Sequence, residues 1–180
     1  MKKIKFINLI IFFTIPFFSF ISADIIDNGK ISFKSVEIGD NYFDFEAFNQ
    51  NLEKIKFSKL FDGKFILLDF TMTDCKGCKN ASQELRLISN NYADLINVVS
   101  FTIDRKKSAW ERYLIRDNVT WISLWDGRGS HGTTCRKYGV KGGPLFFIIN
   151  PEGIVIDKFY GFYDERLIRK LIEHKIIDNK

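Results

Sequence analysis

Two cysteines close together in the sequence are the residues of this chain best suited to chemistry. They lie in the segment Cys75-Lys76-Gly77-Cys78, after the apolar run at 65–70 and before residues with helical periodicity. The run predicts a strand buried on both faces, so the pair falls at a strand-to-helix junction. The unpaired N–H groups at a helix start stabilise a thiolate and lower its pKa. A second sulfur about one turn away can close a small disulfide ring, so this spacing indicates a redox pair.

A structural disulfide and half of a zinc site are the other interpretations of the pair. A structural zinc site takes four ligands, and beyond the pair the chain offers only Cys135, His131 and His174 as soft ligands. We therefore expect no metal and no organic cofactor. Cys135 itself is expected to be a buried free thiol, with a regulatory or intermolecular disulfide as the alternative.

Asp69 and Pro144 are unusual residue types for the apolar segments in which they lie. Asp69 is a carboxylate within the apolar run at 65–70, where an unpaired charge is costly; the alternative is an exposed strand end. Pro144 opens the apolar run at 145–149. Because proline cannot donate to a sheet ladder, it marks either an edge or a bend.

The remaining elements alternate between strands and helices. Apolar residues at 81, 85, 88 and 92 predict a helix that ends near 90–91. We then expect a strand at 98–103, a helix around 109–114, a strand at 121–125, a short helix at 133–138, a hairpin of strands at 145–149 and 154–159, and a final helix capped by Asp164. This order predicts an α/β fold with parallel neighbouring strands.

In this order the motifs resemble those of a thioredoxin-fold protein. They are Leu67-Leu68-Asp69-Phe70, Cys75-Lys76-Gly77-Cys78 and Lys137-Tyr138-Gly139-Val140-Lys141-Gly142-Gly143-Pro144. An extra helix and strand between Asp104 and Tyr138 make the chain similar to the exported TlpA/ResA-like thiol-disulfide oxidoreductases, over roughly residue 57 to the C-terminus. The resemblance implies a thioredoxin-like fold: a central mixed sheet flanked by helices, with an extra N-terminal β segment and a helix-strand insertion.

The resemblance also implies a role for each site residue. Cys75 would be the attacking nucleophile and Cys78 the resolving thiol. Asp69, six positions before Cys75, would handle the proton of Cys78, with its pKa raised toward neutrality by burial. Pro144 would be a cis-proline facing the cysteines, and Gly143 and Pro144 would bind an extended substrate through backbone groups.

Four positions depart from the pattern of the family. Asp74 replaces a frequent tryptophan, Thr71 an aromatic residue, Gly143 a β-branched residue, and Ala81 the glutamate of ResA-like cytochrome-maturation proteins. We therefore expect a site that is less walled in than usual, and a haem-pathway role is not favoured.

The N-terminus is typical of a secretory signal. Three lysines precede a nearly wholly apolar stretch at 6–20, and Ser22-Ala23 follows. We expect a signal peptide at 1–23, an N-terminal β extension at 24–57 with an edge strand at 31–36, and a thioredoxin-like domain at 58–180. The protein would be exported and periplasmic, with a membrane tether as the alternative if the signal is not cleaved.

Composition and charge limit the partners. The chain of 180 residues is 46% hydrophobic and 16% aromatic, which excludes general disorder. Its net charge is +5, and removing the three lysines of 1–23 leaves +2, so we expect no nucleic-acid partner. The expected partners are proteins with disulfides or thiols, and a periplasmic or membrane thiol partner that recycles the pair.

The predicted function is thus the reduction of protein disulfides outside the cytoplasm. A peroxiredoxin-like thiol peroxidase is an alternative, because Thr71-Met72-Thr73-Asp74-Cys75 partly matches its Thr/Ser-x-x-Cys setting. A copper-handling protein is another, with the two cysteines and His131 as ligands. A non-catalytic binding module is a third, less favoured because both cysteines are present. The sequence does not fix the direction of the redox reaction.

Overall fold

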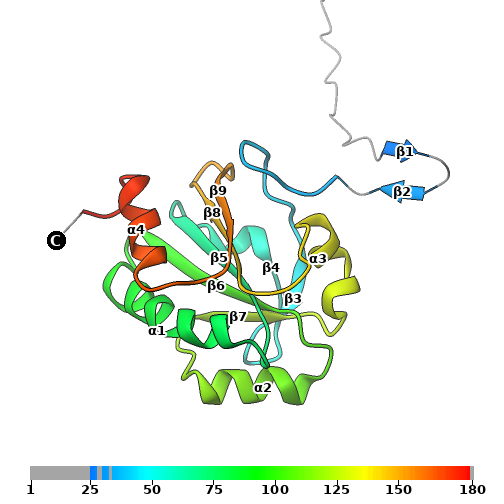
Figure 1. Cartoon of the computed structure of the whole chain (residues 1–180), viewed down its shortest axis with the longest axis horizontal. Helices are drawn as coiled ribbons and strands as arrows, with labels where there is room; N and C mark the ends of the chain where they lie inside the picture. The colour runs from blue at the N-terminus through cyan, green and yellow to red at the C-terminus, as the bar shows by residue number, and fades with distance from the viewer. Residues whose placement is uncertain (1–24, 28–29, 33, 179–180) are drawn as a thin grey trace, which may run out of the picture. The chain divides into compact units, whose positions relative to one another are not determined.

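The computed structural model describes residues 25–27, 30–32 and 34–178 (Figure 1). Contacts divide the chain into Met1–Ser32 and Phe33–Lys180. In the first unit, β1 (Ile25–Asp27) pairs antiparallel with β2 (Lys30–Ser32). The predicted strand at 31–36 is therefore wrong beyond Ser32, because residues 34–36 belong to no strand. The predicted signal segment lies outside the described residues.

The second unit is built on a mixed sheet of seven strands in the order β4-β3-β7-β6-β5-β8-β9. Its central strands β5, β6 and β7 run parallel, and β8, β9, β3 and β4 are joined antiparallel. The bounds are β3 (Glu46–Phe48), β4 (Lys54–Lys56), β5 (Phe65–Thr71), β6 (Ile96–Thr102), β7 (Ile122–Trp125), β8 (Leu145–Ile149) and β9 (Val155–Tyr160).

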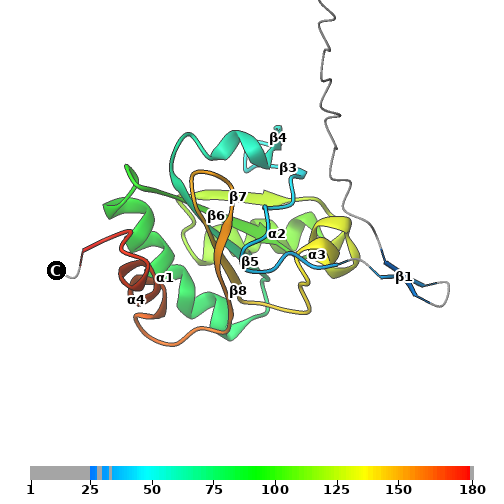
Figure 2. The same cartoon turned by 90° about the horizontal axis from the view of Figure 1, so that it is seen from above.

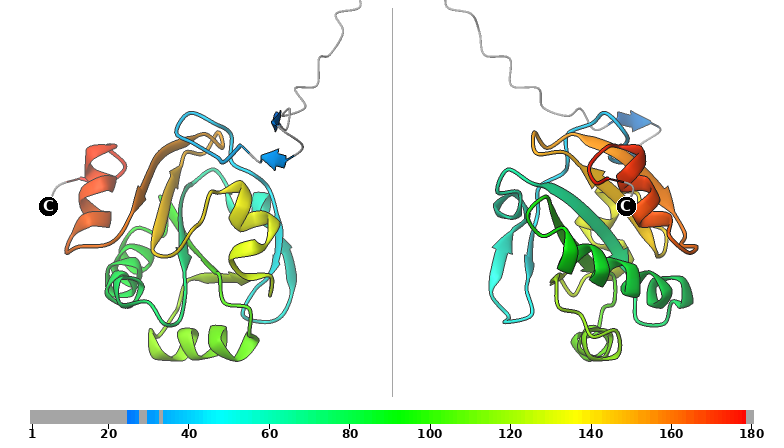
Figure 3. Two further views of the ribbon diagram at one scale, coloured as in Figure 1. Left: turned by 45° about the vertical axis from the view of Figure 1, so that its right-hand side comes forward. Right: turned by 90° about the vertical axis from the view of Figure 1, so that its left-hand side faces the viewer.

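Helices cover both faces of this sheet (Figures 1 and 2). They are α1 (Lys76–Asn91), α2 (Lys107–Arg116), α3 (Thr133–Lys137) and α4 (Arg166–Glu173), with 3-10 turns η1 (Phe57–Leu60) and η2 (Gly129–His131). Figure 3 shows α3 on the side of the sheet opposite α1 and α4. We call the two sides the α1 face, which α2 also covers, and the α3 face.

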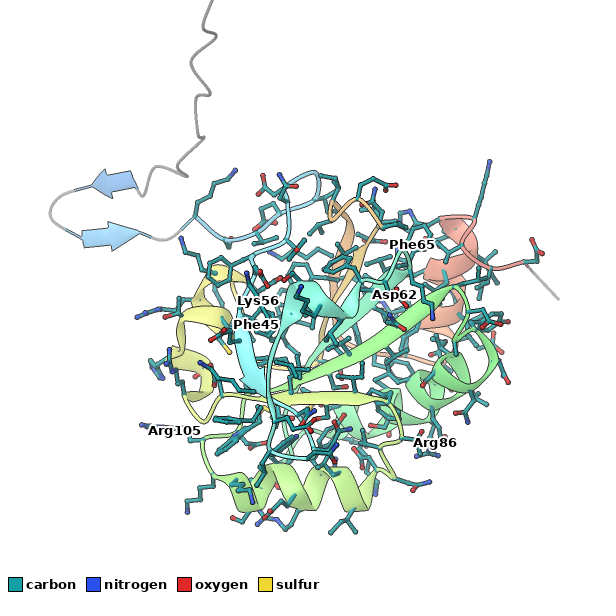
Figure 4. The ribbon with its side chains drawn as sticks, turned by 180° about the vertical axis from the view of Figure 1, so that it is seen from behind. Phe45, Lys56, Asp62, Phe65, Arg86 and Arg105 are labelled. Carbon is teal, nitrogen blue, oxygen red and sulfur yellow. A yellow bond between two sulfur atoms is a disulfide. The ribbon has the colours of Figure 1, made fainter. Side chains whose placement is uncertain are left out.

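Each face has its own core. On the α1 face, Leu67 and Phe146 of the sheet pack against Leu85 of α1 and Leu167 of α4. On the α3 face the core is rich in rings, which are Phe45, Phe57, Phe70, Phe101, Tyr138 and Phe147. Phe45, which precedes β3, is labelled in Figure 4 and stacks on Phe57 with the ring centroids 4.7 Å apart.

The predicted mixed sheet flanked by helices is confirmed, including the inserted helix and strand α2 and β7. The predicted extra N-terminal β segment is present, but the sequence analysis placed its strand at 31–36 and did not identify β3 and β4, which extend the sheet at its β7 edge. The prediction that Asp164 caps α4 is wrong. The N-cap is Glu165, at φ 60°, and it makes no side-chain capping bond. The domain boundary at 57/58 stays a prediction.

Candidate active site

Cys75 and Cys78 form a disulfide at the start of α1, with an S–S distance of 2.10 Å. Cys75 is the N-cap residue of the helix, and its Sγ accepts a hydrogen bond from the Cys78 N–H at 3.0 Å. Cys75 is partly exposed, whereas Cys78 is 1% exposed. A helix N-terminus directs unpaired N–H groups at the first sulfur, so a Cys75 thiolate formed on reduction lies in a stabilising field. Only this sulfur of the pair can meet a large substrate.

The turn that carries Cys75 is fixed from the side of β6 and α2. The Thr73 N–H and hydroxyl both lie within hydrogen-bond distance of Asp104 Oδ2, at 2.8 Å and 2.9 Å, and the hydroxyl also lies 2.7 Å from the Ala109 carbonyl. A guanidinium N–H of Arg116 donates to the Thr73 carbonyl. The backbone two residues before Cys75 is thus held by the loop after β6 and by α2 together.

Asp117, at the end of α2, links this turn to the second cysteine. Its carboxylate accepts two bonds from the Arg116 guanidinium, both at 2.6 Å, and the Ser82 hydroxyl lies 2.9 Å from it. The same hydroxyl lies 3.1 Å from the Cys78 carbonyl. Arg86 of α1 donates to backbone carbonyls at the end of α2 (Figure 4). These contacts join the inserted helix α2 to the first turns of α1.

The Gly143-Pro144 peptide is cis, as the resemblance implied, and Pro144 is buried. A Cβ at Gly143 would lie 2.9 Å from Cys78 Sγ and 2.9 Å from the Phe70 carbonyl oxygen. Glycine is therefore required for this close approach of the loop to the disulfide. Among the described residues, no hydrogen-bond partner is found for the N–H or the C=O of Gly143.

Asp69 lies in the middle of β5 with a side chain that is 1% exposed. It shares the α1 face with Leu67, since side chains alternate along a strand. The pKa of Asp69 is raised to about 7, mainly by burial; a hydrogen bond from Ser100 opposes the rise, and the nearby charge of Asp117 adds to it. The alternative of an exposed strand end is wrong, and this carboxyl can exchange a proton near neutral pH.

A buried network of hydrogen bonds surrounds one oxygen of Asp69. Ser100 Oγ, on the neighbouring strand β6, donates to Asp69 Oδ2 at 3.1 Å. The same Oγ accepts the Tyr113 O–H at 3.1 Å and the Trp121 Nε1–H at 2.8 Å. No partner is found among the described residues for the other oxygen, Asp69 Oδ1. The sequence analysis did not identify Ser100, although a small polar residue inside a predicted buried strand is the same kind of signal as Asp69.

Cys135 and His131 lie apart from this chemistry. Cys135 is a free cysteine with no exposed surface, and burial raises the pKa of its thiol to about 12, which confirms the prediction of a buried thiol. His131 is exposed, at the end of η2.

Within the part of the chain that the structure describes, no three His, Cys, Asp or Glu side chains are grouped so as to hold a metal ion. No helix in this part of the chain is long and apolar enough to cross a bilayer.

Comparison with known proteins places this geometry in a class. The model of the thioredoxin-like family matches residues 63–155. The thiol:disulfide interchange protein DsbE of Yersinia pestis is 29% identical over 179 residues, which cover 92% of this chain and 88% of that protein. The family match spans more than half of the chain, so the chain belongs to the thioredoxin-like family.

Solved structures of similar fold identify the type of thioredoxin-like protein more closely. A putative thiol:disulfide interchange protein DsbE from Chlorobium tepidum superposes with a TM-score of 0.70 and 26% identity, over 79% of this chain and 100% of that chain. The C-terminal domain of a putative thiol-disulfide oxidoreductase from Bacteroides thetaiotaomicron gives 0.69 and 26%, over 78% and 96%. With its Cys75–Cys78 pair, the chain is a thiol-disulfide oxidoreductase of the DsbE/TlpA type.

Proposed function

We propose that the protein reduces disulfide bonds of other proteins outside the cytoplasm. The observation that carries the proposal is the asymmetry of the pair: a partly exposed Cys75 at the start of α1 and a buried Cys78 behind it. An asymmetric pair assigns one sulfur to attack and the other to resolution. The sequence of the N-terminus and the likeness to a DsbE protein support export.

The reaction starts from the reduced pair. The Cys75 thiolate attacks one sulfur of the substrate disulfide, and the other substrate sulfur leaves as a thiolate that takes up a proton. The resulting mixed disulfide joins Cys75 to the substrate. Cys78 then loses its proton and attacks Cys75 Sγ, and the second substrate sulfur leaves as a thiolate. Two electrons have moved to the substrate, whose two thiolates take up one proton that came from Cys78 and one from the solvent, and the Cys75–Cys78 disulfide remains. A thiol partner must reduce it again.

Asp69 is the base that we assign to the second step. A carboxyl whose pKa lies at about 7 is partly ionised at neutral pH, so it can accept the Cys78 proton and later release it. Gly143 is the proposed substrate-binding residue, together with Pro144. Its backbone lies against Cys78 Sγ and has no partner among the described residues, so an extended substrate segment can pair with it.

Trapping of mixed disulfides tests the order of attack. In a Cys135→Ala background, which removes the third thiol, Cys78→Ser should accumulate substrate proteins as stable mixed disulfides, because the resolving thiol is gone. Cys75→Ser should trap almost none, since Cys78 is buried. The conjugates are counted on non-reducing gels after acid quenching. Equal trapping by the two variants would contradict the assignment.

Kinetics across pH test Asp69. We expect Asp69→Asn to leave the attack by Cys75 within a few-fold of wild type, while resolution slows by about 10- to 100-fold and loses its pH dependence near neutrality. Stopped-flow mixing of the reduced protein with a disulfide peptide separates the two steps. Unchanged resolution at every pH would show that the Cys78 proton leaves by another route.

Four measurements test the rest of the proposal. The mature protein should begin at or near Asp24, and full-length protein in the cytosol would refute export. A reduction potential near that of thioredoxin, about −270 mV, supports a reductase, and a far more positive value supports an oxidase or isomerase. Rapid turnover of hydrogen peroxide would favour the peroxidase alternative, and tight Cu(I) binding that His131→Ala abolishes would favour copper handling.

A further inference from the structure

Ser100 Oγ has all of its hydrogen-bonding capacity in use. A hydroxyl has one proton to donate and two lone pairs to accept with. Trp121 Nε1 is only ever a donor, and it takes one lone pair at 2.8 Å. The Tyr113 hydroxyl takes the other at 3.1 Å. The proton of Ser100 is therefore left to point at Asp69 Oδ2, 3.1 Å away. Tyr113 and Trp121 thus orient the hydroxyl of Ser100, which makes the one hydrogen bond to the Asp69 carboxyl that is found among the described residues.

We infer that Ser100 is a positioning residue for the proton step of the redox pair: it holds Asp69 Oδ2, directs proton uptake to Oδ1, and sets the pH at which resolution occurs. This inference rests on the proposed role of Asp69 as the base. Tyr113 and Trp121 act through Ser100 and not on the sulfurs themselves. Since Tyr113 lies on α2 and Trp121 directly before β7, the hydrogen bonds that connect the inserted segment of the fold to Asp69 pass through a single hydroxyl, that of Ser100.

The direction of the effect follows from the hydrogen bond. An ionised carboxylate only accepts hydrogen bonds, so a fixed O–H donor stabilises the charged form over the protonated one. Loss of the Ser100 hydroxyl must make Asp69 harder to ionise. Hydrogen bonds to charged groups are among the stronger ones, and we expect the titration midpoint of Asp69 to rise by about one pH unit in Ser100→Ala.

Few other charged groups affect the pKa of Asp69. Asp117, from the end of α2, raises its pKa, and Arg116 is paired with Asp117. Tyr113, whose own pKa is raised well above its ordinary value by burial, stays neutral and acts as a donor. The flanking strands place Ser100 of β6 and Phe146 of β8 beside Asp69 in register, and both are uncharged. The Ser100 hydroxyl is therefore the one neutral group in this set that donates to the carboxylate.

Ser123 offers a matched control. It pairs in register with Ser100 on the adjacent strand β7, has no exposed surface either, and likewise accepts a tryptophan N–H, from Trp110 at 2.8 Å. It makes no bond to Asp69 in the structure. Ser123→Ala therefore removes a comparable buried hydrogen bond, and it should leave the titration of Asp69 unchanged.

The experiment measures the ionisation of Asp69 directly and through catalysis. The side-chain carboxyl carbon of Asp69 is followed by NMR from pH 4 to 9 in the reduced protein and assigned with Asp69→Asn, and the rate of resolution is measured over the same range. Ser100→Ala should raise both midpoints by about one pH unit, and Tyr113→Phe, which leaves the hydroxyl less firmly oriented, by about half a unit or less. Ser123→Ala should raise neither.

The outcomes separate this inference from the proposed role of Asp69. An unmoved NMR midpoint in both Ser100→Ala and Tyr113→Phe, or an equal rise in Ser123→Ala, would overturn the inference. A raised NMR midpoint without a matching change in the resolution profile would support the control of Asp69 by Ser100 and overturn Asp69 as the base. If Ser100→Ala does not fold, Tyr113→Phe against Ser123→Ala makes the same comparison.

Discussion

The two faces of the central sheet differ most where β5 and β6 lie side by side. Asp69 and Ser100 are paired in register and point to the α1 face, and the next residues, Phe70 and Phe101, are paired and point to the α3 face. The rings of Phe70 and Phe101 lie 5.4 Å apart within an aromatic core. One residue back along each strand, a carboxyl and a hydroxyl are equally buried.

The α3 face of the sheet therefore contributes stability, and the α1 face holds the acid that takes part in the chemistry. A carboxylate taken out of water destabilises the fold, and its raised pKa is the measure of that cost. The apolar burial of the opposite face offsets it without offering any group that could pair with the acid. We therefore expect substitutions on the α3 face to change the free energy of unfolding without moving the pH profile of resolution. Substitutions around Asp69 should move that pH profile and make the free energy of unfolding depend differently on pH.

The largest expected effect is that of Phe101→Ala. The Phe101 ring has no exposed surface and meets the Phe45 and Phe70 rings at 5.2 Å and 5.4 Å between centroids. Its loss should lower the free energy of unfolding by about 3–5 kcal/mol, measured by denaturant titration of the oxidised protein. The pH midpoint of resolution should not move. Phe48→Ala is the control: that ring is 38% exposed and should cost under about 1 kcal/mol. A similar loss in both variants would contradict the special role of the aromatic core.

The second expected effect is a fall in stability with rising pH that depends on Asp69. Its pKa rises from 3.8 to about 7 on folding, so the folded state binds the proton more tightly than the unfolded state. The stability that this contributes is complete below about pH 4 and is lost as the pH rises through 7. Relative to Asp69→Asn, the oxidised wild-type protein should lose roughly 3 kcal/mol of stability between pH 5 and pH 9.

The oxidised form suits this measurement because its disulfide cysteines do not titrate. Glu84 and Asp126 also have pKa values raised by burial, but they are present in both proteins and cancel in the difference. Stability is read from urea titrations at each pH. Parallel curves for wild type and Asp69→Asn would mean that Asp69 is already solvated in the folded protein.

The elements with long, regular patterns could be predicted from the sequence. The apolar run that forms β5 and the periodic residues of α1 are local signals, and so is the turn between β8 and β9. The two short strands β3 and β4 give no such signal, because each has only three residues. Their attachment to β7 depends on distant contacts: the Gln50 side chain donates to the Trp121 carbonyl at 2.6 Å and accepts the Ser123 N–H at 3.1 Å. No pattern in the sequence of β3 and β4 predicts the pairing of β3 with β7.

The residues of the candidate site also divide into those that the sequence predicts and those that only the structure identifies. Cys75, Cys78 and Asp69 are visible in the sequence because each is chemically unusual for its surroundings. The groups that orient Asp69 are not visible in this way, because their positions depend on tertiary structure. Ser100 lies beside Asp69 only through the parallel pairing of β5 and β6, and Tyr113 reaches Ser100 only through the packing of α2. Asp117, which joins α2 to α1, was not identified from the sequence for the same reason. Sequence spacing identifies reactive groups, and tertiary packing decides which groups tune them.

The smallest expected effect is that of Cys135→Ala, which asks whether a cysteine on the α3 face takes part in the chemistry. Cys135 lies in the aromatic core with no exposed surface, and its pKa of about 12 leaves almost no thiolate at pH 8. The variant should lose only about 1 kcal/mol of stability, since a small buried group is removed, and the rates of attack and resolution should stay within twofold of wild type. In the reduced wild-type protein, a thiol reagent should label Cys75 first and reach Cys135 only as fast as the protein unfolds, which mass spectrometry of timed samples measures. Labelling of Cys135 at the rate of Cys75 would place this sulfur within reach of solvent. It would then have to be counted with the redox pair, and the separation between the two faces would fail.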